Sequence, residues 1–179
     1  MNGPQLQGER VHLRPLEPGD RAAMARILAE PEVARWWIHE GLDIAVDGLF
    51  DEEAEVRLAI EVDGQVAGMI QFSEELTPDY RHAGIDIFVA TAFQGRGIGP
   101  EAIRLVARHL FEDRGHHRLI IDPAAANDRA IRAYEKVGFR RVGVMRQYER
   151  SIDGTWHDGL LMDMLAGELV EQDARRGSS

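Results

Sequence analysis

The sequence feature that most constrains the fold is the stretch FQGRGIGPEA, residues 93–102, which places three glycines within five positions. It follows the apolar run AGIDIFVA (83–90), which predicts a central strand. It leads into PEAIRLVARHLFEDRG (100–115), which predicts a helix with Pro100 in its first turn. A glycine turn before a helix leaves backbone N–H groups free to bind an anion. The pattern therefore predicts a site for a phosphate-bearing ligand, although a tight turn without a ligand also fits it.

The spacing of the glycines excludes the two common phosphate motifs. Gly95, Gly97 and Gly99 read G-x-G-x-G, whereas the dinucleotide fingerprint needs its third glycine one position later. Asp122 does stand about where a ribose-binding acid would fall. A Walker loop is excluded because the chain contains no Gly-Lys-Ser/Thr. A nicotinamide enzyme therefore remains a distant alternative.

The rest of the chain alternates strand and helix patterns without repeats or linkers. The predicted order is a strand at 10–16, helix at 17–37 begun by Asp20, a hairpin at 57–73, the central strand, the helix at 100–115, a strand at 118–122, a helix at 127–138 and a hairpin at 139–165. The hairpins turn at Asp-Gly pairs. This order predicts an α/β (α+β) fold, with a mixed sheet carrying helices on its faces. We expect one domain over 1–170 and a flexible tail over 171–179.

Composition excludes several function classes. The 179 residues include no cysteine, so disulfides, cysteine nucleophiles and thiolate metal sites are ruled out. The formal charge of −10 disfavours nucleic-acid binding. No apolar run reaches the ~20 residues of a membrane span, and the first residues do not resemble a signal peptide. We expect a cytoplasmic protein with no metal, no nucleic-acid partner and no membrane association.

A second motif identifies the family. In AAANDRAIRAYEKVGFRRVG (124–143), Asn127 begins a helix that carries Ala130 and Tyr134 on one face. Q-G-R-G-I-G followed by N-x-x-A-x-x-x-Y-E-K-x-G-F resembles the GCN5-related N-acetyltransferase (GNAT) family, and the likeness covers most of the chain. The resemblance implies a mixed central sheet splayed at an acetyl-CoA site. It also implies acetyl-CoA as the co-substrate, with a homodimer as a common assembly.

The resemblance implies which residues hold acetyl-CoA. The backbone amides of the glycine loop would bind the pyrophosphate, and the strand before the loop would pair with the pantetheine arm. The implied cofactor-binding residues are Phe88, Val89, Gln94, Gly95, Arg96, Gly97, Ile98, Gly99, Asn127, Ala130, Tyr134 and Lys136. Asn127 also fits a plain helix cap.

The resemblance also implies the chemistry of transfer. Tyr134 matches the family position whose phenol protonates the departing thiolate, although an aromatic on a buried helix face would look the same. Without a cysteine, transfer is expected to be direct, in a ternary complex. Asp86 and Asp122 are the expected catalytic carboxylates, because a primary amine must lose a proton before it attacks. Asp86 is the better candidate for the base, while Asp122 precedes a proline and also fits a turn cap.

Three segments resemble aminoglycoside 6'-N-acetyltransferases: VARWW (33–37), AGIDIFVA, and residues 120–139. The matching residues, implied to bind the acceptor, are Trp36, Trp37, Asp86 and Asp122, and Glu40 of the neighbouring acidic stretch is a further expected acceptor residue. The expected substrate is therefore an aminoglycoside amine, giving antibiotic resistance, with the tryptophans as walls for sugar rings or as ordinary core residues.

An acidic stretch without Lys or Arg over 36–56 strengthens the expectation of a cationic acceptor, although such runs usually form solvated helix faces. Its carboxylates are Glu40, Asp43, Asp47, Asp51, Glu52, Glu53 and Glu55.

The closing hairpin keeps other acceptors open, because it resembles ribosomal-protein N-terminal acetyltransferases. Its residues that either line an acceptor cleft or alternate on an exposed hairpin are Arg146, Tyr148, Trp156, His157 and Asp158. The alternatives are therefore a protein or other small-amine acetyltransferase. An acyl-CoA-binding scaffold without turnover is a further alternative from another functional class.

Overall fold

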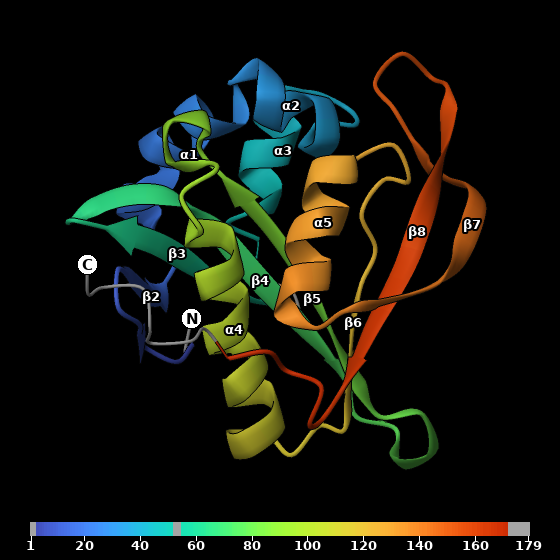
Figure 1. The fold of residues 1–179 in the computed structure, drawn as a ribbon. Helices are drawn as coiled ribbons and strands as arrows, with labels where there is room; N and C mark the ends of the chain where they lie inside the picture. Colours follow the sequence, from blue (N-terminus) through green and yellow to red (C-terminus); the bar gives the residue numbers. More distant parts are fainter. Residues whose placement is uncertain (1–2, 52–54, 172–179) are drawn as a thin grey trace, which may run out of the picture.

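The computed structural model describes residues 3–51 and 55–171, which share an eight-stranded mixed sheet (Figure 1). The strands lie in the order β1-β2-β3-β4-β5-β6-β8-β7. Their bounds are β1 Leu6–Gln7, β2 Val11–Pro15, β3 Val56–Val62, β4 Gln65–Glu75, β5 His82–Val89, β6 Arg118–Ile121, β7 Arg140–Arg150 and β8 Trp156–Leu165. All neighbours pair antiparallel except β5 and β6, which are parallel. The predicted mixed α/β fold is confirmed.

Helices cover both faces of the sheet. Their bounds are α1 Arg21–Leu28, α2 Pro31–Trp37, α3 Leu42–Gly48, α4 Ile98–Arg108 and α5 Asp128–Val137. The predicted helical stretch at 17–37 is broken before Pro31, because a residue that precedes proline disfavours helical backbone. The expected cap by Asp20 is wrong: its carboxylate accepts two hydrogen bonds from the Arg14 guanidinium instead, each 2.8 Å long.

Alternation along the strands produces two cores. Leu58 of β3 and Ile70 of β4 belong to a buried cluster with residues of α4 and α5. Their neighbours Ala59 and Met69 belong to a second cluster with residues of α1, α2 and α3. Figure 1 shows α4 and α5 over one face of the sheet, with the β7–β8 hairpin at its edge. Because helices pack on both faces of the sheet, its central apolar strands are buried on both sides.

The sheet splits where β5 leaves β6. Their pairing is limited to Ala83 with Leu119 and Gly84 with Ile120, whereas β5 stays paired with β4 as far as Val89. The second half of β5 therefore has a free edge, and its backbone groups can bind an extended ligand. This split is the splayed sheet that the sequence predicts.

The local turns follow the predicted chemistry. Asp63 and Gly64 have φ values of 51° and 73°, which is the left-handed pair of a type I′ hairpin turn. Gly154, at the tip of the closing hairpin, also has a left-handed φ of 83°. Within the described residues, no helix is long and apolar enough to cross a bilayer. Of the predicted tail, Glu171 is described and pairs with Arg108 at 2.6 Å, while 172–179 lie outside the described residues.

Candidate active site

A cleft of about 1020 Å³ opens at the split of the sheet, between the free edge of β5, the start of α4, helix α5 and helix α2. It brings together most of the predicted site residues. Those that line it are Trp36, Trp37, Asp86, Phe88, Val89, Gln94, Gly95, Gly99, Asp122, Asn127, Ala130, Tyr134 and Lys136. Arg96, Gly97 and Ile98 belong to the same loop but are not among its lining residues, nor is Glu40, which is exposed beside His39.

The glycine loop has the backbone of an anion site. Gly95 and Gly97 adopt left-handed φ values of 73° and 79°, and Gly97 is the cap residue from which α4 begins. Alternating left- and right-handed residues turn successive N–H groups toward one side, and the first N–H groups of the helix have no partner within it. The Arg10 side chain stabilises the loop, because its Nη1 donates a hydrogen bond to the Arg96 carbonyl oxygen at 2.6 Å. The loop therefore presents free backbone N–H groups that can bind an anion.

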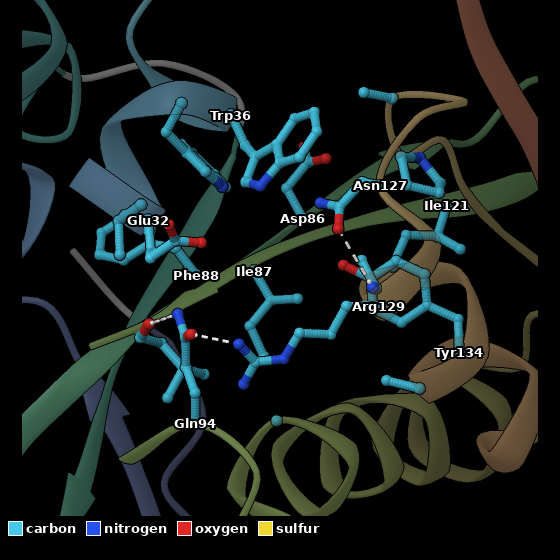
Figure 2. A pocket seen from close by; sticks show the side chains of 18 of the residues that line it. Glu32, Trp36, Asp86, Ile87, Phe88, Gln94, Ile121, Asn127, Arg129 and Tyr134 are labelled. Atoms are coloured by element: carbon cyan, nitrogen blue, oxygen red, sulfur yellow. Dashed lines mark hydrogen bonds between the residues drawn. The ribbon is translucent and has the colours of Figure 1, made fainter. Parts of the chain in front are cut away.

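Gln94 and Arg129 connect the two sides of the cofactor end of the cleft. The Gln94 side chain donates to the Val89 carbonyl at 2.8 Å and accepts from Arg129 Nη1 at 2.6 Å (Figure 2). Gln94 therefore fixes the loop to the end of β5, while Arg129 reaches from α5 to the loop. Sequence analysis missed Arg129. The signal was a cation in the first turn of the α5 motif, two positions after Asn127.

Helix α5 presents Asn127 and Tyr134 to the cleft. Asn127 Oδ1 accepts from the Ala130 N–H at 3.2 Å, so the helix-cap interpretation is confirmed. The Tyr134 hydroxyl has no hydrogen-bond partner among the described residues, and its ring packs against Phe139 with centroids 6.4 Å apart. Burial, together with the nearby charges of Asp86 and Asp122, holds the pKa of the Tyr134 phenol well above its usual value. The phenol is thus protonated at neutral pH and can donate.

Asp86 lies on β5 at the free edge of the strand. Burial raises the pKa of its carboxyl to about 6, and the charges of Asp122 and Glu55 add to the shift. A hydrogen bond of 3.3 Å from Gln71 Nε2 acts in the opposite direction. A carboxylate with a pKa just below neutrality is suited to accept a proton at physiological pH. Gln71 is a second residue that sequence analysis missed.

Asp122 lines the same cleft as Asp86 and lies just after β6. Tyr148 of β7 donates to Asp122 Oδ2 at 2.5 Å, and this bond is the main cause that raises the pKa of the Tyr148 phenol to about 12. Asp122 therefore has a fixed partner, and it lines the cleft rather than only capping its turn. Burial dominates the surroundings of Asp86, whereas Asp122 accepts a hydrogen bond from Tyr148. Different surroundings of this kind allow two carboxylates to take different roles in a reaction.

A bulge in β7 positions Tyr148. The pairing of β7 with β8 shifts over residues 146–148, and Gln147 has a left-handed φ of 49°. The Gln147 N–H donates to Asp158 Oδ1 at 2.8 Å, which stabilises this conformation. Gly159 leaves room for the ring, because a Cβ there would lie 2.7 Å from Tyr148 Cδ1. Five residues of the closing hairpin were expected either to line an acceptor cleft or to lie on an exposed hairpin. Of these, Tyr148 lines the cleft, and Asp158 stabilises the bulge that positions Tyr148.

Both tryptophans line the cleft, and Trp37 also packs against the core. Trp37 packs edge-on against Phe88 with ring centroids 4.8 Å apart, and it belongs to the α1–α3 core. The guanidinium of Arg35 lies over the Trp36 ring, 4.5 Å from its centroid. Figure 2 shows Trp36 beside Asp86 at the acceptor end. Trp36 is thus the better placed of the two to contact an acceptor.

None of the described carboxylates of the acidic stretch lines the cleft, although the charge of Glu55 raises the pKa of Asp86. Asp47 pairs with Arg21 and lines a separate groove with Asp43, Glu55 pairs with Arg57 at 3.0 Å, and Glu52 and Glu53 lie outside the described residues. A solvated helix face is the better description of Asp43 and Asp47. The carboxylates that line the cleft are Glu32, Asp86, Asp122, Asp128 and Glu149. Sequence analysis missed Glu32 and Glu149, because the elements that carry them are far apart in the chain.

Comparison with known proteins agrees with this geometry. Residues 10–140 match the model of the acetyltransferase (GNAT) domain. The spermidine N(1)-acetyltransferase of Escherichia coli K12 is 28% identical over 94% of this chain and 93% of its own length. The aminoglycoside N(6')-acetyltransferase type 1 of Klebsiella pneumoniae is 29% identical over 76% of this chain and 77% of its own. The solved structure of Mycobacterium smegmatis RimJ with CoA-disulfide is 28% identical and covers 90% of this chain and 85% of its own, with a TM-score of 0.78.

Proposed function

The chain belongs to the GNAT acetyltransferase family and is an acetyl-CoA-dependent N-acetyltransferase that acts on an amine; we propose that this amine belongs to an aminoglycoside. The observation that carries the proposal is the pair of carboxylates, Asp86 and Asp122, which line the same cleft as Trp36 and lie near enough for the charge of one to raise the pKa of the other. A polyamine with sugar rings would find both charge partners and a flat apolar wall there.

The residues of the cleft fit acetyl-CoA. The loop at 94–99 would hold the diphosphate through backbone N–H groups, and a Cβ built at Gly95 meets no atom within 4 Å, so the cradle is open. The free edge of β5 at Phe88 and Val89 would pair with the pantetheine amides. Arg129 and Lys136 add positive charge on the α5 side. Acetyl-CoA supplies the activated acetyl group when bound.

The side chains then divide the proton transfers. Asp86 accepts the proton that the ammonium group of the acceptor loses, and the free amine attacks the thioester carbon. Tyr134 donates its phenolic proton to the sulfur as the carbon–sulfur bond breaks, and the phenolate regains a proton from the attacking nitrogen, which loses its second proton as the amide forms. Asp122, held by Tyr148, binds the cationic acceptor and orients its amine. Because the chain has no cysteine, the acetyl group passes directly from sulfur to nitrogen.

A linear polyamine is the second candidate acceptor. The match to the spermidine N(1)-acetyltransferase extends over nearly the whole of both chains, further than the match to the aminoglycoside enzyme. The same carboxylates would bind spermidine through its ammonium groups. The N-terminal amine of a protein is a third candidate, since RimJ is among the similar structures.

The test is a comparison of kcat/KM for kanamycin, spermidine and an N-terminal peptide at equal acetyl-CoA. We expect the aminoglycoside to have the highest kcat/KM, and mass spectrometry would locate the acetyl group. A higher value for spermidine would replace the aminoglycoside with a polyamine, and turnover of the peptide alone would reject both.

A further inference from the structure

A row of three polar side chains crosses the centre of the sheet and ends at the cleft. Arg57 of β3 is the cross-strand partner of Gln71 of β4, and Gln71 is the partner of Asp86 of β5. The row ends at Asp86 because β6 no longer pairs with β5 beyond Gly84. Each of the three residues is flanked by apolar residues in its strand. Arg57 is buried and the other two are partly buried, so their polar groups need hydrogen-bond partners, and the row supplies them.

The chemistry of the row fixes its direction. A guanidinium can only donate hydrogen bonds, whereas an amide side chain has one accepting and one donating end. Arg57 Nε donates to Gln71 Oε1 at 3.2 Å, so the Gln71 amide nitrogen is turned toward Asp86 and donates to its Oδ2 at 3.3 Å. Gln71 cannot reverse its amide without placing its NH₂ group against the guanidinium.

Arg57 is held firmly enough to impose this orientation. It is 5% exposed, and its two other nitrogens donate to the Asp51 carbonyl at 2.8 Å and to Glu55 Oε2 at 3.0 Å. All three nitrogens of the guanidinium therefore have partners. The rotamer of the guanidinium is set by groups on its far side, away from the cleft.

We propose that Gln71 is a positioning residue for the proton acceptor Asp86, and that Arg57 acts on Asp86 only through Gln71. The inference rests on the proposed function, in which Asp86 accepts the proton of the amine. The Gln71 amide keeps one carboxylate oxygen of Asp86 engaged and stabilises the ionised form. Without it, burial and the neighbouring carboxylates would raise the pKa of Asp86 further toward neutrality.

The groups that face Asp86 define how it titrates. Glu55 precedes β3, Asp122 follows β6, Tyr134 comes from α5 and Tyr148 from β7. The two carboxylates disfavour ionisation of Asp86 by charge, and the two phenols stay protonated. The other charged residues of the cleft wall are Glu32, Arg35, His39, Asp128, Arg129, Arg132, Lys136 and Glu149. The hydrogen bond from Gln71 lowers the pKa of Asp86 against burial and these charges.

The first test needs no variant. In the folded protein, the Asp86 carboxyl carbon and the Gln71 side-chain NH₂ are followed by NMR as pH is raised from 4 to 8. We expect both signals to move with one midpoint, near 6. A Gln71 NH₂ signal that does not change while Asp86 titrates would overturn the proposal.

The second test removes the amide. Gln71→Leu, with Gln71→Met as a longer apolar alternative, should move the Asp86 midpoint and the acidic limb of kcat/KM upward by about one pH unit. Gln65→Leu, at the exposed start of the same strand, is the matched control and should move neither. An unshifted midpoint in a folded Gln71 variant would contradict the proposal.

A double-mutant cycle tests the role of Arg57. Arg57→Lys keeps the charge but loses the fork that reaches three partners, so it should raise the Asp86 midpoint in the wild-type background. In the Gln71→Leu background the same change should add no shift, whereas an equal shift in both backgrounds would show that Arg57 acts directly. The NMR titration needs no acceptor, so it tests the row even if no offered amine is acetylated and the proposed function fails.

Discussion

The most informative single residue is Tyr134, because its phenol faces Asp86 and Asp122 and has no hydrogen-bond partner among the described residues. If it protonates the leaving thiolate, Tyr134→Phe should lower kcat about 10²-fold and change the KM for acetyl-CoA little. Steady-state kinetics at saturating acceptor measure this. The control is Tyr80→Phe, in the exposed connection between β4 and β5, which should leave kcat unchanged.

If Tyr134→Phe has the kcat of wild type, Tyr134 does not donate the proton, and its ring only packs against Phe139. A rise in the acetyl-CoA KM without a loss of kcat would instead assign it to cofactor binding.

The pKa of Asp86 predicts opposite effects on activity and stability. Its value of about 6 in the folded protein lies above the ordinary 3.8, so the folded state binds this proton more tightly than the unfolded state. Stability is therefore lost as pH rises from about 4 to about 6. Asp86→Asn should abolish the acidic limb of kcat/KM near pH 6 and lower its plateau. It should also stabilise the folded protein at pH 8 by roughly 3 kcal/mol at most.

Urea unfolding of wild type and Asp86→Asn at pH 4 and pH 8 checks the stability effect, which should be confined to the higher pH. A variant that is less stable than wild type at pH 8 would show that the Asp86 carboxylate is not strained by burial.

At the scale of elements, the glycine loop can be tested with a matched pair of glycines. Gly95 and Gly115 have nearly equal left-handed φ values, 73° and 68°, and a Cβ at either meets no protein atom within 4 Å. Alanine at either should cost about 1–2 kcal/mol of stability. Gly95→Ala alone places a methyl group in the cleft, so it should also raise the acetyl-CoA Kd at least tenfold, as measured by calorimetry. Equal Kd values for the two variants would remove the loop from the cofactor site.

The bulge of β7 makes a prediction for acceptor binding. Asp158→Ala removes the acceptor of the Gln147 N–H, so the bulge should relax and Tyr148 should separate from Asp122. The acceptor KM should rise about tenfold while the acetyl-CoA KM stays near wild type, because a charge-assisted hydrogen bond is worth roughly 1.5–3 kcal/mol. Asp158→Asn keeps an accepting oxygen and should restore most of the loss. No rescue by asparagine would contradict the positioning role of the bulge.

Elements with local signals were predictable from the sequence. The patterns that predict strand β5, the glycine turn and α5 each lie within one short segment of the sequence. Asn127 caps α5, as its position before the helix indicates. The row from Arg57 through Gln71 to Asp86 was missed because it depends on strand register, which joins residues 14 and 15 positions apart. Its signal was a polar residue between apolar neighbours in each of three strands.

Charge was the least predictable property of the site. A run of acidic residues shows how much charge a segment carries but not which way the segment faces. Asp47 therefore pairs with Arg21, away from the cleft, while Glu32 and Glu149 reach the cleft from α2 and β7. The cap role expected of Asp20 failed for the same reason, since Arg14 is a stronger partner than the backbone of its own helix.

At the scale of the whole molecule, the cleft at the split of the sheet carries charges of both signs. The start of α4 and the cations Arg129 and Lys136 of α5 line it, and so do carboxylates from several elements. The net charge of −10 adds a long-range attraction for a cationic acceptor. Charges of both signs suit the two substrates of the proposed reaction, an anionic nucleotide thioester and a polycation.

Thiol release from acetyl-CoA, measured with and without kanamycin, tests the central claim most directly. We expect release that depends on the aminoglycoside, with one acetyl group gained by the drug and release much reduced in Asp122→Asn. Acetyl-CoA that binds but releases no thiol with an aminoglycoside, spermidine or a peptide would contradict the account, and the chain would then be an acyl-CoA-binding protein without turnover.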